Sequence, residues 1–272
     1  MTDSFHYEGS IAVVGGGRMG EAIASGLVSA GCVDSARFTI VEPNSARRDE
    51  LTAAHGVRCV RDAVDALPAD LVLLAVKPQI ADAVLAGLAD RVGSGLVVSI
   101  VAGFSTARLE SLLPEGTAVV RVMPNTPAMV GEGMAVVSGG RETSAEQVEL
   151  VRALFAQIGH ALVVDERYQN AATAISGSGP AYFALVIDAL ARAGVRHGLP
   201  RDVAQTLAVQ TMLGTAKMLE VTGMHPEALV DGVSSPGGTT IAAIEALEAH
   251  TLRAAFFEAV AANVERAEEL GS

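Results

Sequence analysis

Residues 11–20 read Ile11-Ala12-Val13-Val14-Gly15-Gly16-Gly17-Arg18-Met19-Gly20, an apolar run that leads directly into glycines spaced Gly-x-Gly-x-x-Gly. The run predicts a strand, and residues 21–28 after it have a helical pattern. In this context Gly15 permits a tight turn, Gly17 lets a pyrophosphate approach the backbone, and Gly20 allows the helix to pack on the strand. We therefore predict a dinucleotide site here, with Gly15, Gly17, Met19 and Gly20 among its cofactor-binding residues.

Beyond this loop, short β-branched runs alternate with helical stretches as far as about residue 165, an α/β pattern. Two apolar runs, 71–76 and 96–101, are continuous rather than alternating, as expected for strands of a parallel sheet covered on both faces. We predict a mostly parallel sheet in a Rossmann-type dinucleotide-binding domain, residues 1–165. Its expected strands are 11–14, 38–41, 57–60, 71–76, 96–101, 119–122, 134–137 and 162–164.

After residue 165 the strand signals stop, and the pattern is helical. We expect one long helix at about 167–197, another after Pro200, a short one near 226–231, and two more from Thr239 to the end. Long helices rich in Ala, Leu and Val, with no sheet to cover, pack against one another and here against a second copy of the chain. Residues 166–272 are predicted to form an all-helical domain for substrate binding and dimerisation.

The overall composition limits the classes of partner. A net charge of −12 argues against nucleic acid or an anionic membrane as a partner, since both require a basic face. The two cysteines, Cys32 and Cys59, have no metal-ligand spacing, so no metal is expected and the pair suits a reducing compartment. We find neither the pattern of a signal peptide nor an uninterrupted apolar run of membrane-spanning length, and predict a soluble cytoplasmic protein.

A second ligand site is predicted near the C-terminus, where Val233-Ser234-Ser235-Pro236-Gly237-Gly238-Thr239-Thr240-Ile241 precedes an apolar helical pattern. The first turn of a helix has backbone N–H groups without intrahelical partners, and its dipole favours negative charge. The two glycines allow close approach of a ligand, and the hydroxyls of Ser235, Thr239 and Thr240 add hydrogen bonds. A small carboxylate would fit this cradle, although an ordinary capped helix after a turn is the alternative.

The segment after the second predicted strand carries opposite signals for the cofactor. Glu42 stands where an acidic residue would bind the ribose 2′-OH of NADH and repel a 2′-phosphate. Arg47 and Arg48, with Asn44 nearby, are suited to hold that phosphate, unless they only form a solvated helix face. We favour NADPH as the cofactor, with NADH also usable.

Three further loops follow the carboxyl ends of predicted strands, the edge at which open α/β sheets bind ligands. Each could be a plain turn, but their common position predicts a shared role along the nicotinamide half of the cofactor. The amide of Asn125, between two prolines, could orient the nicotinamide or bridge to the substrate. The cofactor-binding residues predicted in these loops are Ala75, Val76, Lys77, Pro78, Ala102, Gly103 and Asn125.

Together these segments resemble the pyrroline-5-carboxylate reductase family nearly end to end. The resemblance rests on the glycine loop, on Ala75-Val76-Lys77-Pro78-Gln79, on Arg121-Val122-Met123-Pro124-Asn125-Thr126-Pro127, on Ser176-Gly177-Ser178-Gly179-Pro180-Ala181-Tyr182 and on the segment 233–241. It implies an N-terminal Rossmann domain and a helical C-terminal domain that interlocks with its partner in a homodimer. In several members the dimers assemble further into a ring, such as a decamer, and each active site draws on both chains.

The resemblance also implies roles for individual residues. Ser235 and the backbone of Gly238, Thr239 and Thr240 would bind the substrate carboxylate, with the Thr240 hydroxyl near the imine nitrogen as the catalytic group. Ser176 would lie close to the substrate. The implied reaction is hydride transfer from NAD(P)H to the C=N bond of 1-pyrroline-5-carboxylate, which gives L-proline. An iminium accepts hydride without a strong enzyme acid, which explains why no catalytic dyad is visible.

Three alternatives remain. A reductase of another cyclic imino acid is compatible with the sequence. A 3-hydroxyacid dehydrogenase relative would need a helix lysine as general base, and residues 176–182 contain none. A non-enzymatic nucleotide sensor would have lost the cradle, which is intact. The sequence leaves open the oligomer size beyond a dimer, feedback by proline, tolerance for larger imines and the role of the residues before Ser10.

Overall fold

The computed structural model describes residues 5–271, so the parts of the N-terminal extension and of the C-terminal prediction that fall on residues 1–4 and 272 lie outside it. Its contacts divide the chain into two compact units. The sheet unit comprises the residues up to Ser178 and the segment from Val264, and the helical unit comprises Gly179–Asn263. The sequence-based division at residue 165 stays a prediction.

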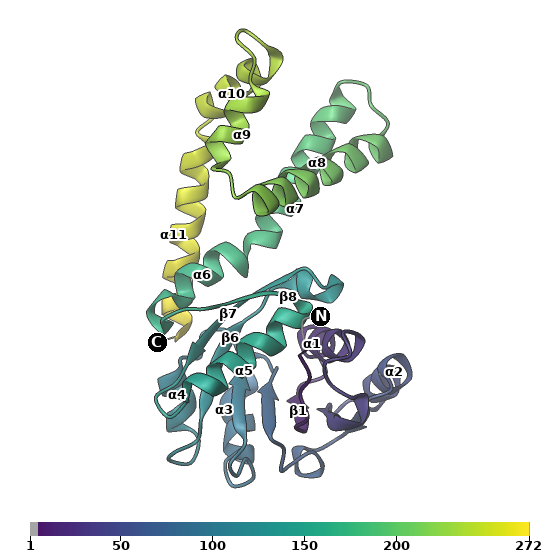
Figure 1. Ribbon diagram of the computed structural model, residues 1–272, viewed down its shortest axis with the longest axis vertical. Helices are drawn as coiled ribbons and strands as arrows, with labels where there is room; N and C mark the ends of the chain where they lie inside the picture. The colour runs from purple at the N-terminus through teal and green to yellow at the C-terminus, as the bar shows by residue number, and fades with distance from the viewer. Residues whose placement is uncertain (1–4, 272) are drawn as a thin grey trace. The chain divides into compact units, whose positions relative to one another are not determined.

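The sheet unit contains one eight-stranded sheet in the order β3-β2-β1-β4-β5-β6-β7-β8 (Figure 1). Every neighbouring pair is parallel except β6 and β7, so the mostly parallel α/β fold is confirmed. A strand occurs at each of the eight predicted places, but β4 and β5 end two residues earlier than predicted, and β8 begins three residues earlier. The elements are β1 (Ile11–Val14), α1 (Arg18–Ser29), β2 (Phe38–Val41), α2 (Ser45–His55), β3 (Arg58–Val60), β4 (Leu71–Leu74), α3 (Pro78–Leu88), β5 (Leu96–Ser99), α4 (Thr106–Ser111), β6 (Val119–Met123), β7 (Gly133–Gly139), α5 (Ala145–Phe155), β8 (Gly159–Val163) and α6 (Gln169–Ser176).

Alternation along the strands divides the core of this unit between two faces of the sheet. Ile11 and Val13 of β1 belong to the cluster that also holds buried side chains of α1, α2 and α5. Ala12 and Val14 belong to the cluster with buried side chains of α3 and α4. Because both faces are covered, β1 and β4 at the centre of the sheet are apolar at every position.

The helical unit contains α7 (Gly179–Arg196), α8 (Arg201–Thr222), α9 (Pro226–Val233), α10 (Thr239–Ala249) and the first part of α11 (Leu252–Gly271). The predicted single helix over 167–197 is wrong, since α6 ends at Ser176 and a turn at Gly177 and Ser178 precedes α7. The physical reason is Pro180, which has no N–H to donate to the Ser176 carbonyl and whose ring excludes an undistorted helix there.

The segment Glu166–Arg196 is nevertheless long and apolar enough to cross a membrane by length and composition alone. It is not an uninterrupted apolar run, because it includes Thr173, Ser176 and Ser178 among its apolar residues. Core and interface helices of soluble proteins pass the same test, and only 17% of the window is buried in this chain.

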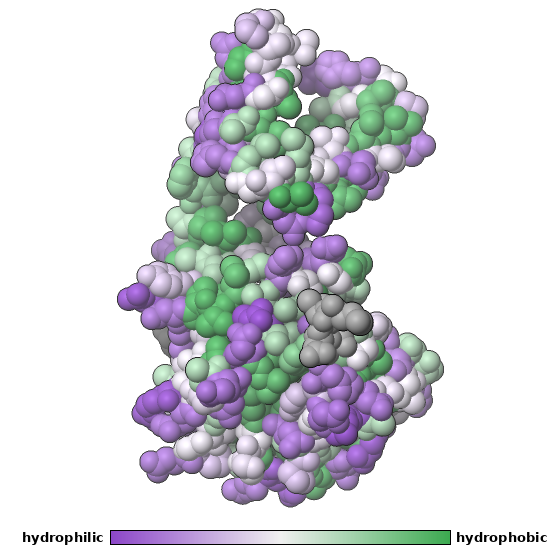
Figure 2. All heavy atoms as spheres, viewed as in Figure 1, coloured by the Kyte–Doolittle hydropathy of each residue, from purple (hydrophilic) through white to green (hydrophobic). Residues whose placement is uncertain are grey.

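The helical unit has very little core of its own. Its fully buried hydrophobic side chains, among the described residues, are Ala191, Ala204 and Ala208, where α7 and α8 pack together. Large apolar side chains are instead exposed, including Leu185 at 70%, Leu213 at 60% and Phe257 at 79%. Figure 2 shows apolar residues at the surface of these helices. Such a surface marks an interface rather than a free face.

Candidate functional site

The glycine loop between β1 and α1 adopts a conformation that only glycine tolerates. Gly15 has a φ of 115°, and a Cβ there would clash with the Ala75 carbonyl. A Cβ on Gly20 would clash with the carbonyl of Gly15, so this glycine lets α1 start directly against the loop. A Cβ on Gly17 would meet no atom within 4 Å, so the backbone there is open to a ligand.

A cavity of about 580 Å³ lies beside this loop, at the carboxyl ends of β1, β2 and β4. The strand order changes direction here, because β1 lies between β2 and β4, and open α/β sheets bind ligands at such a point. The lining includes the predicted residues Gly15, Gly17, Ala75, Val76 and Lys77, together with Glu42. It also includes Arg61, Asp62 and Ala63, which follow β3 and which the sequence analysis did not single out.

Glu42 lies in this lining directly after β2. One of its carboxylate oxygens accepts the Asn44 N–H at 2.9 Å. The Asn44 side chain in turn caps α2 by accepting the Arg47 N–H at 3.3 Å. From this position an acidic residue can hydrogen-bond the two hydroxyls of a ribose. The position of Glu42 therefore agrees with the sequence-based indication that NADH can bind.

The two arginines predicted to hold a 2′-phosphate are occupied by protein groups. Arg47 is paired with Glu21 and Glu50, and its Nε donates to the Gly16 carbonyl at 3.1 Å. Arg48 donates from Nη1 to the carbonyls of Glu42 and Pro43, at 2.8 and 2.9 Å. Both therefore border the site, with Arg47 held through all three guanidinium nitrogens and Arg48 held through Nη1.

The other predicted cofactor residues, Met19, Pro78, Ala102 and Gly103, do not line the cavity. Met19 is partly buried and packs against the core, and Pro78 is the first residue of α3. Ala102 and Gly103 follow β5 in the turn before α4, where Gly103 has a φ of 79°. The structure thus brings the ends of the first four strands together around one cavity, and places the β5 loop outside its lining.

Asn125 has a structural role that the sequence did not indicate. It is buried, and its Nδ2 donates to the Ser176 carbonyl at 3.0 Å, which Pro180 leaves without a helical donor. Its Oδ1 accepts the Met134 N–H at 2.8 Å. The hydroxyl of Ser176 itself donates to the Ala172 carbonyl at 3.0 Å. Asn125 therefore fixes the end of α6, which carries Ser176, to the start of β7.

A buried ion pair also holds this region and was missed by the sequence analysis. Arg121 of β6, whose side chain is 7% exposed, donates from Nη1 to Glu166 at 3.2 Å and from Nη2 to Asn170 at 3.3 Å. Glu166 also accepts the N–H and the hydroxyl of Thr106 at the start of α4. Arg121 is the first residue of the segment 121–127 that carries part of the family resemblance. Nothing local in the sequence, however, identifies its partner 45 residues away.

The second predicted site lies in the helical unit, at the start of α10. Thr239 and Thr240 are its first two residues, and its N-cap, Gly238, provides no side-chain cap. Gly237 has a φ of 67°, and the Gly238 N–H donates to the Ser235 carbonyl at 2.9 Å, which closes the turn. A Cβ on Gly238 would clash with the Ser235 hydroxyl. The predicted hydroxyls and N–H groups therefore lie together at one helix N-terminus, where the helix dipole favours an anion.

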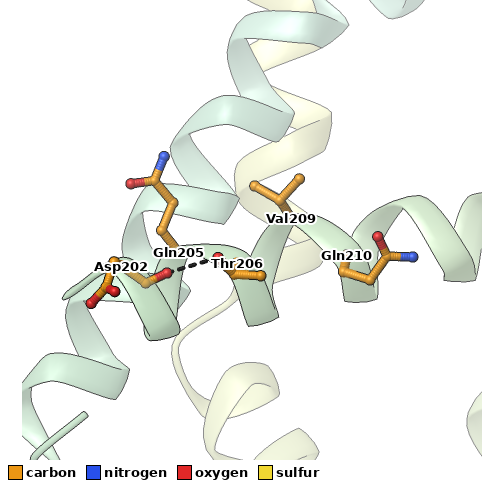
Figure 3. A pocket seen from close by; sticks show the side chains of 5 residues that line it. All are labelled: Asp202, Gln205, Thr206, Val209 and Gln210. Carbon is orange, nitrogen blue, oxygen red and sulfur yellow. Dashed lines mark hydrogen bonds between the residues drawn. The ribbon is translucent and has the colours of Figure 1, made fainter. Parts of the chain in front are cut away.

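A separate hollow lies along α8, lined by Asp202, Gln205, Thr206, Val209 and Gln210 (Figure 3). All five side chains come from one helix, and the only hydrogen bond drawn there runs from the Thr206 hydroxyl to the Asp202 carbonyl, 2.9 Å. None of the predicted site residues contributes to it, so it forms part of the exposed helical surface and not of either candidate site.

The sheet, the glycine loop and the cavity define a dinucleotide-dependent oxidoreductase. A family model described as "NADP oxidoreductase coenzyme F420-dependent" matches residues 10–103, and one described as "Pyrroline-5-carboxylate reductase dimerisation" matches residues 166–270. The chain belongs to the pyrroline-5-carboxylate reductase family.

Individual relatives match almost the whole chain. The pyrroline-5-carboxylate reductase of Synechocystis is 44% identical over 96% of this chain and 98% of its own. The solved structure of the Coxiella burnetii enzyme is 34% identical with a TM-score of 0.91, covering 98% of this chain and 100% of the other. That of the Plasmodium falciparum pyrroline carboxylate reductase, with NADP bound, is 29% identical with a TM-score of 0.90 and the same coverage.

Proposed function

We infer that this protein is a pyrroline-5-carboxylate reductase, which reduces the C=N bond of 1-pyrroline-5-carboxylate with NAD(P)H and forms L-proline in the last step of proline biosynthesis. The observation that carries this assignment is the match of 44% identity over 96% of the chain to a reductase of that name. The glycine loop, the cavity and the intact α10 cradle supply the parts that the reaction requires.

The residues present fit a dinucleotide. The open backbone at Gly17 and the N-terminus of α1 suit the pyrophosphate. Glu42 in the cavity lining and Arg47 on the Gly16 carbonyl would lie near the ribose. When bound, the cofactor supplies the hydride. Ala75, Val76 and Lys77 line the same cavity from the end of β4. We assign the cofactor-binding role to these residues together with Gly15, Met19, Gly20, Asn44, Arg48, Pro78, Ala102 and Gly103, and propose that Asn125 orients the nicotinamide or bridges to the substrate.

The α10 cradle is proposed to bind the substrate. The N–H groups of Thr239 and Thr240 and the hydroxyl of Ser235 would hold the carboxylate, since a helix N-terminus favours an anion without needing a cationic side chain. The Thr240 hydroxyl would hydrogen-bond the imine nitrogen, and Ser176 would lie near the ring. Catalysis by these residues is then mainly orientation, because a protonated cyclic imine is already a good hydride acceptor.

We propose that NADPH is the preferred cofactor and that NADH is also used. Arg47 and Arg48 in the first turn of α2 support the preference, and Glu42 in the cavity lining supports the second activity.

The protein is proposed to work in the cytoplasm, away from membranes, as homodimers that assemble further into a ring. The dimerisation match over 166–270 and the exposed apolar helices support assembly. Two free thiols, Cys32 and Cys59, suit a reducing compartment. We keep the division at residue 165, close to the end of β8 at Val163, as the proposed boundary between cofactor and dimerisation domains.

The test is oxidation of NADPH and of NADH by the purified protein with 1-pyrroline-5-carboxylate and with its six-membered homologue. We expect fast turnover of the five-membered imine with L-proline as the product. Preferential turnover of the larger ring would instead assign the chain to another cyclic imino acid. Cofactor binding without turnover of either imine would contradict the proposed reaction and leave the fold assignment intact.

A further inference from the structure

Arg47 lies in a cluster of charged side chains that joins α1 to α2. Its guanidinium pairs with Glu21 in the first turn of α1, and its Nε donates to the Gly16 carbonyl in the glycine loop at 3.1 Å. The other oxygen of Glu21 lies 3.0 Å from Nε2 of His55, the last residue of α2. We call Glu21, Arg47 and His55 the α1–α2 cluster.

Of the two carboxylates that pair with Arg47, Glu21 makes the stronger ion pair. The side chains of Arg47 and Glu21 are 28% and 26% exposed, whereas that of Glu50, which contacts the same guanidinium at 3.1 Å, is 66% exposed. Solvent and salt screen exposed ion pairs more than partly buried ones. The orientation of Arg47, with Nε on the glycine loop, is therefore determined mainly by Glu21.

The carboxyl group of Glu21 is ionised at neutral pH. Burial by itself raises its pKa, but the hydrogen bonds from His55 and Arg47 outweigh that effect, and the pKa is lowered overall. The pKa of Arg47 is raised, chiefly by its hydrogen bond to Glu21. The pair is thus ionised on both sides, and a phosphate that reaches Arg47 must compete with a carboxylate already in contact with it.

We propose that Glu21 is a specificity-determining residue, which limits the preference for NADPH by competing with the 2′-phosphate for Arg47. NADH has no 2′-phosphate and leaves the α1–α2 cluster undisturbed, with Glu42 available for its ribose hydroxyls. NADPH must detach the guanidinium from Glu21 to gain the full contact. This inference rests on the proposed use of NAD(P)H by the chain.

The experiment is direct titration of NADP⁺ and NAD⁺ into the full-length protein and into Glu21→Gln, without any imine. Glutamine keeps the size of the side chain but removes the charge that holds Arg47. We expect the dissociation constant for NADP⁺ to fall about threefold to tenfold, as for loss of one partly screened ion pair, while that for NAD⁺ changes less than about twofold. Because no imine is used, a failure of the proposed reaction does not affect this readout.

Two controls identify the route of the effect. Glu50→Gln removes the same charge from the same arginine at an exposed position, and its effect on NADP⁺ should be clearly smaller. In an Arg47→Ala background, Glu21→Gln should no longer improve NADP⁺ binding. Equal gains in affinity for NADP⁺ and NAD⁺, or an undiminished gain in the Arg47→Ala background, would overturn the proposal.

A second variant covers the case in which Glu21→Gln does not fold. Glu21→Asp withdraws the carboxylate by one methylene and should shift the ratio of the NADP⁺ and NAD⁺ dissociation constants in the same direction. An unchanged ratio would overturn the proposal.

Discussion

Thr240 is the residue whose chemistry can be separated most cleanly from its structural role. It lies in the first turn of α10, with a side chain that is only partly buried. Thr240→Val keeps the shape and the β-branch but removes the hydroxyl proposed to bind the imine nitrogen. We expect kcat to fall about tenfold, the effect of one lost hydrogen bond in the transition state, with an unchanged thermal unfolding midpoint.

The matched control for this variant is Thr206→Val in α8. Its hydroxyl donates only to the Asp202 carbonyl of its own helix, at 2.9 Å (Figure 3). We expect kcat to stay at the level of the unmodified protein. A Thr240→Val enzyme with unchanged kinetics would remove Thr240 from the mechanism.

Asn125 tests whether a residue predicted to touch the cofactor acts by positioning. Asn125→Ala leaves the Met134 N–H and the Ser176 carbonyl without their buried partner. We expect the free energy of unfolding to fall by about 2 kcal/mol, measured by urea denaturation, because both groups lose a desolvated hydrogen bond. The NADP⁺ dissociation constant should remain nearly unchanged. A large loss of NADP⁺ affinity with normal stability would instead support direct contact of Asn125 with the cofactor.

At the scale of elements, the Arg121–Glu166 pair joins β6 to the start of α4 and to the segment that leads into α6. Glu166→Gln removes the charge that balances a guanidinium only 7% exposed. We expect the free energy of unfolding to fall by about 2 kcal/mol, less than for a fully buried pair because the Glu166 side chain is 27% exposed. Glu149→Gln, which breaks the exposed pair with Arg152, should cause no measurable loss in the same urea titration. Equal stability of the two variants would show that the Arg121 pair is not a determinant of stability.

The stability that the contacts between α1 and α2 contribute should depend on pH through Glu21. Its folded-state pKa lies below the ordinary value because the hydrogen bonds from His55 and Arg47 outweigh the effect of burial. Its stabilising contribution is therefore complete above the unfolded-state pKa and is lost as the pH falls through the folded-state pKa. The difference in unfolding free energy between the natural protein and Glu21→Gln should be larger at pH 7 than at pH 3.5. A difference that grows towards low pH would contradict this sign.

Local sequence patterns predicted most of the helices and strands but not the contacts between them. The strands could be predicted because a sheet covered on both faces demands continuous apolar runs, and the glycine loop because its backbone excludes other residues. The break after Ser176 was signalled by Gly177 and Pro180, and was missed because the apolar pattern on either side is continuous. The pairing of Arg47 with Glu21, 26 residues away, depends on how α1 and α2 pack, which no local pattern specifies.

At the scale of the whole molecule, the two units differ in how far they can be stable alone. The sheet unit has two extensive clusters of buried side chains, whereas the buried cluster of the helical unit consists of three alanines. Hydrophobic burial is the main favourable term in folding, so the helical unit needs a further surface against which to pack. The dimerisation match over residues 166–270 indicates that a second copy of the chain supplies it.

An obligate dimer should therefore be sensitive to one charge on this surface. Leu213 of α8 is 60% exposed in the single chain, and Leu213→Glu would place a carboxylate on the apolar surface that we propose as the dimer interface, once from each copy. We expect light scattering at micromolar concentration to show loss of the dimer, together with loss of imine turnover and a lower unfolding midpoint. Val64→Glu, at a position 48% exposed in the sheet unit, is the control and should leave assembly unchanged. A Leu213→Glu monomer that stayed folded and fully active would refute obligate dimerisation, because it would show that the helical unit is stable and functional without a partner.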